Sequence, residues 1–138
     1  MLSAFFFLLG MFDLPSGEWS GAVRGGDQLT LEVGPPETKI VTLRWHRNSK
    51  VRNEISVLGS YQVTATKGQP HVTMHVDLIN VEGDASLNAQ GGLDIGNWHI
   101  LPDRDLRMVL RYEGKTLHLE AFDPDTSAHL EHFILAEQ

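Results

Sequence analysis

Apolar and polar residues alternate along most of this chain, which is the pattern of β-strands that bury one face. The cleanest run covers residues 71–78, where Val72, Met74, Val76 and Leu78 alternate with polar residues. A period of two places these four side chains on one face of a strand. Similar runs occupy residues 28–33, 39–47, 55–65, 93–101, 106–112, 116–122 and 130–135. The sequence therefore predicts an all-β chain.

Turn signals separate these runs and predict how the strands are joined. Clusters of Gly, Pro and other turn residues occur at 34–36, 66–70, 113–115 and 123–125. Gly59 lies inside the run 55–65, where a glycine indicates a bulge or a barrel corner. About eight to ten short strands without an amphipathic helix indicate a sandwich or a barrel. Consecutive hairpins favour an antiparallel up-and-down barrel, because closure leaves no unpaired edge.

The first residues form an apolar segment that the strand pattern does not include. Residues 2–12 are uncharged and apolar, and this run is well short of the ~20 residues that span a bilayer. Two interpretations stay open: a packed lid over the barrel mouth, or a targeting or contact segment that meets a protein or membrane surface through Phe5, Phe6 and Phe7. We therefore predict an N-terminal segment at 1–16 and a single β-barrel domain at 17–138.

Composition excludes several classes of function. A net charge of -7 opposes the attraction to phosphate on which nucleic-acid binding relies, so we expect no nucleic-acid partner. The chain has no cysteine, which excludes disulfides, thiolate metal sites and cysteine nucleophiles. Cysteine usage fits both a cytoplasmic and an exported protein, and it leaves the oligomeric state open.

Gly17-Glu18-Trp19-Ser20-Gly21 opens the strand series, and a tryptophan between two glycines can plug one end of a closed sheet. This Gly-x-Trp-x-Gly start resembles the calycins, the superfamily of lipocalins, fatty-acid-binding proteins and nitrobindins, and it is closest to the nitrobindin form. Residues 112–124 are also similar to small lipocalin-like domains common in planctomycete genomes. The resemblance implies a calycin-like barrel with Gly17, Trp19 and Gly21 at its plugged end.

The resemblance to nitrobindins also implies a cofactor. In that family a C-terminal histidine followed by leucine is the proximal haem ligand, and His129-Leu130 carries that role here. From the residues alone, His129 equally follows the 123–125 turn as a loop histidine. The resemblance therefore implies haem as a cofactor, with His129 as its ligand.

Aromatic and sulfur-containing residues within the predicted strands are the candidate lining of a ligand site. They are Trp45, Tyr61, Met74, Trp98, Met108 and Phe122. Arg44, Arg107 and Arg111 also lie within strands, and an inward arginine binds a ligand carboxylate with two hydrogen bonds. The alternative for each arginine is a solvated position on the outer face. We include Arg111 among the ligand-binding candidates.

No residue pattern indicates catalysis. His71 and His75 share a strand face but lie about 13 Å apart, too far to chelate one metal ion. Paired aspartates at 103 and 105 and at 123 and 125 adjoin prolines in turns, where Asp bonds the local backbone. The sequence lacks a Gly-x-Ser-x-Gly elbow and a phosphate loop.

The sequence therefore favours a protein that is not an enzyme, a lipocalin-like barrel that binds a small hydrophobic or amphipathic molecule. Two alternatives remain. One is nitrobindin-like haem binding through His129, and the other is a structural or interaction subunit whose filled barrel docks through the N-terminal apolar segment.

Overall fold

A computed structural model describes residues 14–47, 53–66 and 69–138 of the chain. Ten strands lie in these residues, together with the short 3-10 turns η1 (Arg24–Gly26) and η2 (Pro36–Thr38). The strands are β1 (Gly17–Ala22), β2 (Gln28–Val33), β3 (Ile40–His46), β4 (Asn53–Thr66), β5 (Gln69–Gly83), β6 (Leu93–Ile95), β7 (Trp98–Ile100), β8 (Asp105–Glu113), β9 (Thr116–Phe122) and β10 (His129–Glu137).

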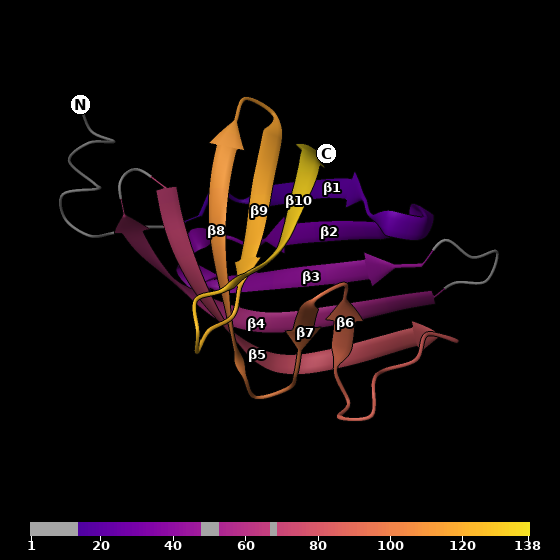
Figure 1. The fold of residues 1–138 in the computed structure, drawn as a ribbon. Coiled ribbons are helices and arrows are strands. Elements are labelled where there is room, and N and C mark those ends of the chain that lie inside the picture. The colour runs from indigo at the N-terminus through magenta and orange to yellow at the C-terminus, as the bar shows by residue number, and fades with distance from the viewer. Residues whose placement is uncertain (1–13, 48–52, 67–68) are drawn as a thin grey trace, which may run out of the picture.

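Eight of the strands close into an antiparallel barrel in the order β1-β10-β9-β8-β5-β4-β3-β2 (Figure 1). Strands that follow one another in sequence are neighbours, apart from the step from β5 to β8, and the first strand pairs with the last at Trp19 and Glu137. The all-β, up-and-down barrel predicted from the alternation is therefore confirmed. Strands β6 and β7 form a separate two-stranded hairpin in the connection from β5 to β8.

The longest hairpin is β4–β5, and Gly59 lies at its irregularity. The register shifts between Leu58 and Gly59, so the bulge expected from a glycine in a long strand is confirmed. A Cβ on Gly59 would lie 2.1 Å from the carbonyl oxygen of His75 on β5. Only glycine fits this close approach of two backbones.

The inner face of the barrel carries the hydrophobic core. Its side chains are between 0% and 8% exposed, and they come from all eight barrel strands. Trp19 is 5% exposed and its ring lies over Gly17, where a Cβ would meet the ring at 3.0 Å. Gly21 lets β1 approach β10, because a Cβ there would lie 2.3 Å from the carbonyl oxygen of Ile134.

The β6–β7 hairpin adds a second layer to this core at one end of the barrel. It buries Leu93, Ile95, Trp98 and Ile100. Its turn meets β10, because a Cβ on Gly96 would lie 2.4 Å from the Glu131 carboxylate. The hairpin is thus packed onto the barrel and is no free loop.

The N-terminal segment is described only from Leu14 onward. Leu14 is buried, and the Ser16 hydroxyl donates to the carbonyl of Gly34 at 3.0 Å. Phe5, Phe6 and Phe7, proposed from the sequence as a contact surface, lie outside the described residues. In the described part of the chain we find no helix with the length and apolar character needed to cross a membrane.

Candidate functional site

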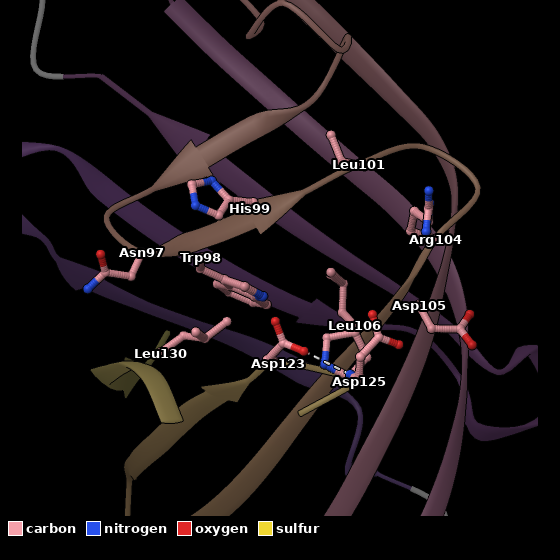
Figure 2. Close-up of a pocket in the computed structure, with 11 residues that line it drawn as sticks. Asn97, Trp98, His99, Leu101, Arg104, Asp105, Leu106, Asp123, Asp125 and Leu130 are labelled. Carbon is pink, nitrogen blue, oxygen red and sulfur yellow. Dashed lines mark hydrogen bonds between the residues drawn. The ribbon is translucent and has the colours of Figure 1, made fainter. Parts of the chain in front are cut away.

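A groove opens where the β6–β7 hairpin meets the turns at the same end of the barrel. Its volume is about 210 Å³. Figure 2 shows side chains from the hairpin, from the β7–β8 connection and from the β9–β10 turn around one space. They belong to Asn97, Trp98, His99, Leu101, Arg104, Asp105, Leu106, Asp123, Pro124, Asp125 and Leu130.

Trp98 forms an apolar wall of this groove together with Leu101, Leu106 and Leu130. The side chain is only 1% exposed, yet its indole nitrogen points toward Asp123 and Leu106 in Figure 2. The indole N–H makes no hydrogen bond within the described residues. Among the described residues, the buried side-chain polar atoms without a partner are the hydroxyls of Tyr61 and Tyr112, so the indole nitrogen is reached from the groove, where it can donate to a ligand acceptor.

The carboxylate of Asp123 lies on the β9–β10 side of the groove. Its Oδ1 accepts hydrogen bonds from the backbone N–H of Thr126 at 2.9 Å and of Asp125 at 2.8 Å. These two bonds lower the pKa of Asp123, which keeps the carboxylate ionised. Asp123 therefore bonds the local backbone in a turn, as the sequence predicts. Its second carboxylate oxygen accepts neither of these two bonds.

The opposite rim carries charges of both signs. Arg104 and Asp105 are exposed there, and the Asp105 carboxylate accepts a hydrogen bond from His75 Nδ1 at 2.9 Å. That hydrogen bond raises the pKa of His75. His99 in turn bonds Asp94 at 2.7 Å, which lowers the pKa of Asp94. The groove combines an apolar wall with cationic and anionic groups, the arrangement expected for an amphipathic ligand.

A second groove of about 190 Å³ lies beside the β9–β10 turn. Its lining is His71, Arg107, Met108, Val109, Phe122 and Ser127. Arg107 Nη1 donates to Ser127 Oγ at 3.0 Å, so this arginine already has a partner on the protein. We regard the first groove as the stronger candidate because it combines an indole N–H that makes no hydrogen bond to the protein with an apolar wall and charged groups of both signs.

Four of the predicted lining residues lie in the core of the barrel. Trp45 is 7% exposed, Tyr61 3%, Met74 0% and Met108 2%. Their surfaces are therefore covered by other side chains, as in an ordinary protein interior. The structure brings these four together, but as packed core.

Trp98, Phe122 and Arg111 lie elsewhere. Trp98 is on the hairpin and lines the first groove. Phe122 and Arg111 have the opposite parity to the buried residues of β9 and β8, so their side chains are on the outer face. There Arg111 pairs with Glu113, and the ring of Phe122 meets the ring of His129 edge-on at 5.3 Å.

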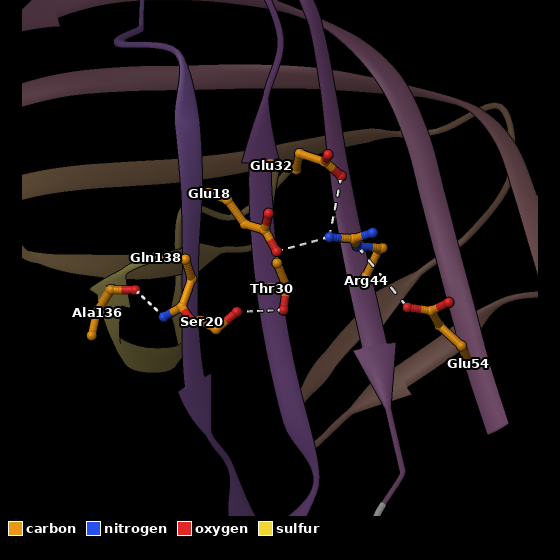
Figure 3. Close-up of polar contacts among 8 residues, drawn as sticks. All are labelled: Glu18, Ser20, Thr30, Glu32, Arg44, Glu54, Ala136 and Gln138. Carbon is orange, nitrogen blue, oxygen red and sulfur yellow. Dashed lines mark hydrogen bonds and ion pairs between the residues drawn. The ribbon is translucent and has the colours of Figure 1, made fainter. Parts of the chain in front are cut away.

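Arg44 also lies on the outer face. Figure 3 shows it among three carboxylates, with Nη2 2.9 Å from Glu18 and 3.5 Å from Glu32, and Nε 4.0 Å from Glu54. Beside this network the hydroxyls of Ser20 and Thr30 bond at 2.7 Å. Arg44 is thus a surface residue that neutralises acidic neighbours across strands β1 to β4.

His129, the haem ligand implied by the resemblance, lies at the start of β10. Its Nε2 is 3.4 Å from Glu120 Oε1 and its side chain is 47% exposed. It lines neither groove. A haem ligand needs a deep apolar pocket on its coordinating side, and the residues around His129 do not fit that group.

Metal chelation by side chains finds no support among the described residues, which hold no group of three or more potential ligands. Two histidines are close, with His118 Nδ1 2.9 Å from His132 Nε2. Their ring centroids are 5.1 Å apart, which fits an end-to-end hydrogen bond between the two imidazoles.

Tyr61 and Tyr112 place two hydroxyl groups inside the barrel. Both are buried and neither has a hydrogen-bond partner. Burial raises the pKa of Tyr112, and the neighbouring Tyr61 raises it further. The ring of Trp19 lies 5.6 Å from that of Tyr112, so these residues form the core at the plugged end.

No protein-family model, curated protein or solved structure matches this chain. Function therefore has to be inferred from the fold and from the chemistry of the groove. Of the groove residues, Trp98 is predicted from the sequence as a ligand contact, whereas Leu101, Arg104 and Leu130 are not. One signal was present: Gly96-Asn97 between Ile95 and Trp98 is a two-residue hairpin turn that would place Trp98 beside the barrel.

Proposed function

We propose that this protein is a non-enzymatic barrel that binds a small amphipathic molecule in the groove beneath the β6–β7 hairpin. The closed eight-stranded barrel is compatible with the calycin-like fold that Gly17-x-Trp19-x-Gly21 suggests. The binding site differs from the one expected from sequence, because the ligand lies beside the barrel end and the interior serves as scaffold.

The observation that carries this proposal is the indole N–H of Trp98. It is a donor on an almost fully buried side chain, it faces a groove, and it has no partner within the described residues. A ligand acceptor would satisfy it, while Leu101, Leu106 and Leu130 cover an apolar portion. Arg104 and the carboxylate of Asp123 are the charged groups that orient a polar end.

The groove volume limits the ligand. At about 210 Å³ it is smaller than the ~300 Å³ at which drug-sized sites begin. The ligand is therefore a compact molecule, or a longer one of which only one end enters.

The three tryptophans allow a direct test by NMR. Trp98 lines the groove, while Trp19 and Trp45 lie in the barrel core, so their ¹⁵N-indole signals report on different places. Native mass spectrometry of freshly purified protein identifies a co-purified small molecule, and fragment screening supplies ligands otherwise. We expect binding to shift the Trp98 indole signal and to leave that of Trp45 in place.

Two variants sharpen this test. Trp98→Phe keeps the aromatic packing and removes the donor, so affinity should fall about tenfold, the cost of one net hydrogen bond. Phe122→Leu in the second groove is the matched control and should bind as the wild type does. A ligand that shifts Trp45 and leaves Trp98 in place would contradict the proposal and would return the site to the barrel interior.

A further inference from the structure

Two opposite charges line the groove beneath the β6–β7 hairpin without pairing with each other. Arg104, on the β7–β8 connection, is exposed at the rim, and its guanidinium makes no hydrogen bond and no ion pair within the described residues. Asp123, in the β9–β10 turn, lines the same groove, and in the described part of the chain no ion pair joins it to Arg104. Both charges are therefore open to groups on a ligand.

The charge of Asp123 is stabilised by neutral groups. Its Oδ1 accepts hydrogen bonds from the backbone N–H of Thr126 at 2.9 Å and of Asp125 at 2.8 Å, and the Thr126 hydroxyl also bonds the carboxylate. These bonds lower the pKa of Asp123, so its carboxylate is ionised near neutral pH. No cation of the described residues pairs with it. The carboxylate therefore keeps its negative charge beside the groove, where a ligand ammonium can neutralise it.

The other charged groups favour a ligand that carries both signs. Asp105 is already occupied by its hydrogen bond with His75 at 2.9 Å. Asp125 adds a second carboxylate on the side of Asp123. A purely anionic ligand would bring a like charge to these carboxylates, and a purely cationic ligand would bring a like charge to Arg104. A zwitterion meets an opposite charge on each side.

The uncharged part of the groove sets the size and character of the ligand. Branched aliphatic surface comes from Leu101, Leu106 and Leu130. The indole N–H of Trp98 lies beside this surface on the side toward Asp123 (Figure 2). At about 210 Å³ the groove admits only a short apolar group. An α-amino acid combines these features in a small space, because its ammonium, its carboxylate and its side chain share one carbon atom.

We propose that this groove binds a free α-amino acid with an aliphatic side chain. The inference rests on the proposed function, because it names the ligand class of the same groove. The ammonium of the amino acid donates to the carboxylate of Asp123. Its carboxylate accepts two hydrogen bonds from the planar guanidinium of Arg104 and a third from the indole N–H of Trp98. Its aliphatic side chain lies against Leu101 and Leu106.

Three probes of nearly equal shape test each charge separately. L-leucine carries both charges, 3-methylbutylamine is leucine without the carboxylate, and 4-methylpentanoate is leucine without the ammonium. Each is titrated at neutral pH while the ¹⁵N-indole signals of the protein are recorded. We expect leucine to shift the Trp98 signal saturably and to leave that of Trp45 in place. Each singly charged analogue should bind at least tenfold more weakly, since a hydrogen bond to a charged group contributes that much or more.

Two variants assign the ligand charges to their partners. Arg104→Gln should weaken the binding of leucine and of 4-methylpentanoate at least tenfold and should not weaken that of 3-methylbutylamine. Asp123→Asn keeps an oxygen acceptor for the backbone bonds of the turn and removes the charge. It should weaken the binding of leucine and of 3-methylbutylamine but not that of 4-methylpentanoate. Arg111→Gln, an equal loss of charge on the outer face, is the matched control and should bind all three probes as the wild type does.

Four results would overturn the inference. Equal binding of 3-methylbutylamine and leucine would show that the groove does not recognise a carboxylate. Equal binding of 4-methylpentanoate and leucine would show that it does not recognise an ammonium. A Trp98 signal that shifts with another molecule but not with millimolar leucine would leave the proposed function standing without this ligand class. A shift of the Trp45 signal alone would contradict both the ligand class and the proposed function.

Discussion

The ring of Trp98 on β7 packs against the ring of Phe133 on β10, with centroids 5.9 Å apart and planes inclined by 35°. This contact joins the hairpin to the barrel, since Phe133 is a core residue of the closed sheet. The same tryptophan therefore anchors the hairpin with its ring and faces the groove with its indole nitrogen. Stability and the proposed binding can be separated at this position, because they would depend on different atoms of one side chain.

Replacement of Trp98 should show this separation in stability measurements. We expect Trp98→Ala to lower the free energy of unfolding by about 3–5 kcal/mol, as other large aromatic truncations in cores do. Trp98→Phe should cost less than about 1.5 kcal/mol, since most of the ring contact remains. Urea unfolding monitored by circular dichroism measures both. Equal and small losses in the two variants would show that the hairpin does not depend on this ring.

The strands of the barrel could be predicted from sequence because each buries one face. Alternation predicts strands at residues 71–78 and 116–122, and these lie within β5 and β9. The predicted buried face is correct for Val72, Met74 and Val76 but wrong for Leu78, which is 54% exposed because the register shifts after Val76. Gly59 indicates the bulge because only glycine fits where the two backbones approach so closely. Patterns of this kind are local, so a single sequence contains them.

The hairpin and the groove were less predictable. The sequence predicts one run at residues 93–101, but this segment forms two strands of three residues each, too short to show a period. The groove is built from segments that are distant in sequence, with Trp98, Arg104 and Asp123 on different connections. Alternation shows which side of a strand is buried and contains no information about which turns meet in space.

Trp19 should contribute strongly to stability at the other end of the barrel. It is 5% exposed and packs over Gly17 and beside Tyr112. We expect Trp19→Ala to lower the free energy of unfolding by about 3–5 kcal/mol. A loss below about 1 kcal/mol in chemical denaturation would contradict a plugging role for this ring.

The unpartnered hydroxyls of Tyr61 and Tyr112 give a prediction of opposite sign. A buried polar group without a hydrogen bond costs roughly 1–3 kcal/mol, so its removal should not destabilise the protein. We expect Tyr61→Phe to leave the free energy of unfolding unchanged or to raise it by up to about 1 kcal/mol. Thermal and urea unfolding of the single variants check this. A clear loss of stability in Tyr61→Phe would mean that the hydroxyl binds water or a small molecule inside the barrel.

The pair of His75 and Asp105 should make stability depend on pH near neutrality. The hydrogen bond that His75 donates to Asp105 raises the pKa of His75 above its ordinary value of 6.5, with added attraction from Asp77 and Asp103. A raised folded-state pKa means that protonation favours the folded protein. The contribution is complete below pH 6.5 and is lost as the pH rises through the folded-state pKa. The melting temperature should therefore decline slightly over that interval, and Asp105→Asn should remove this part of the decline.

NMR titration of the His75 ring gives the direct measurement: its pKa should lie above 6.5 in the wild type and should fall in Asp105→Asn. The same His75 pKa in both proteins would show that the 2.9 Å contact does not persist in solution.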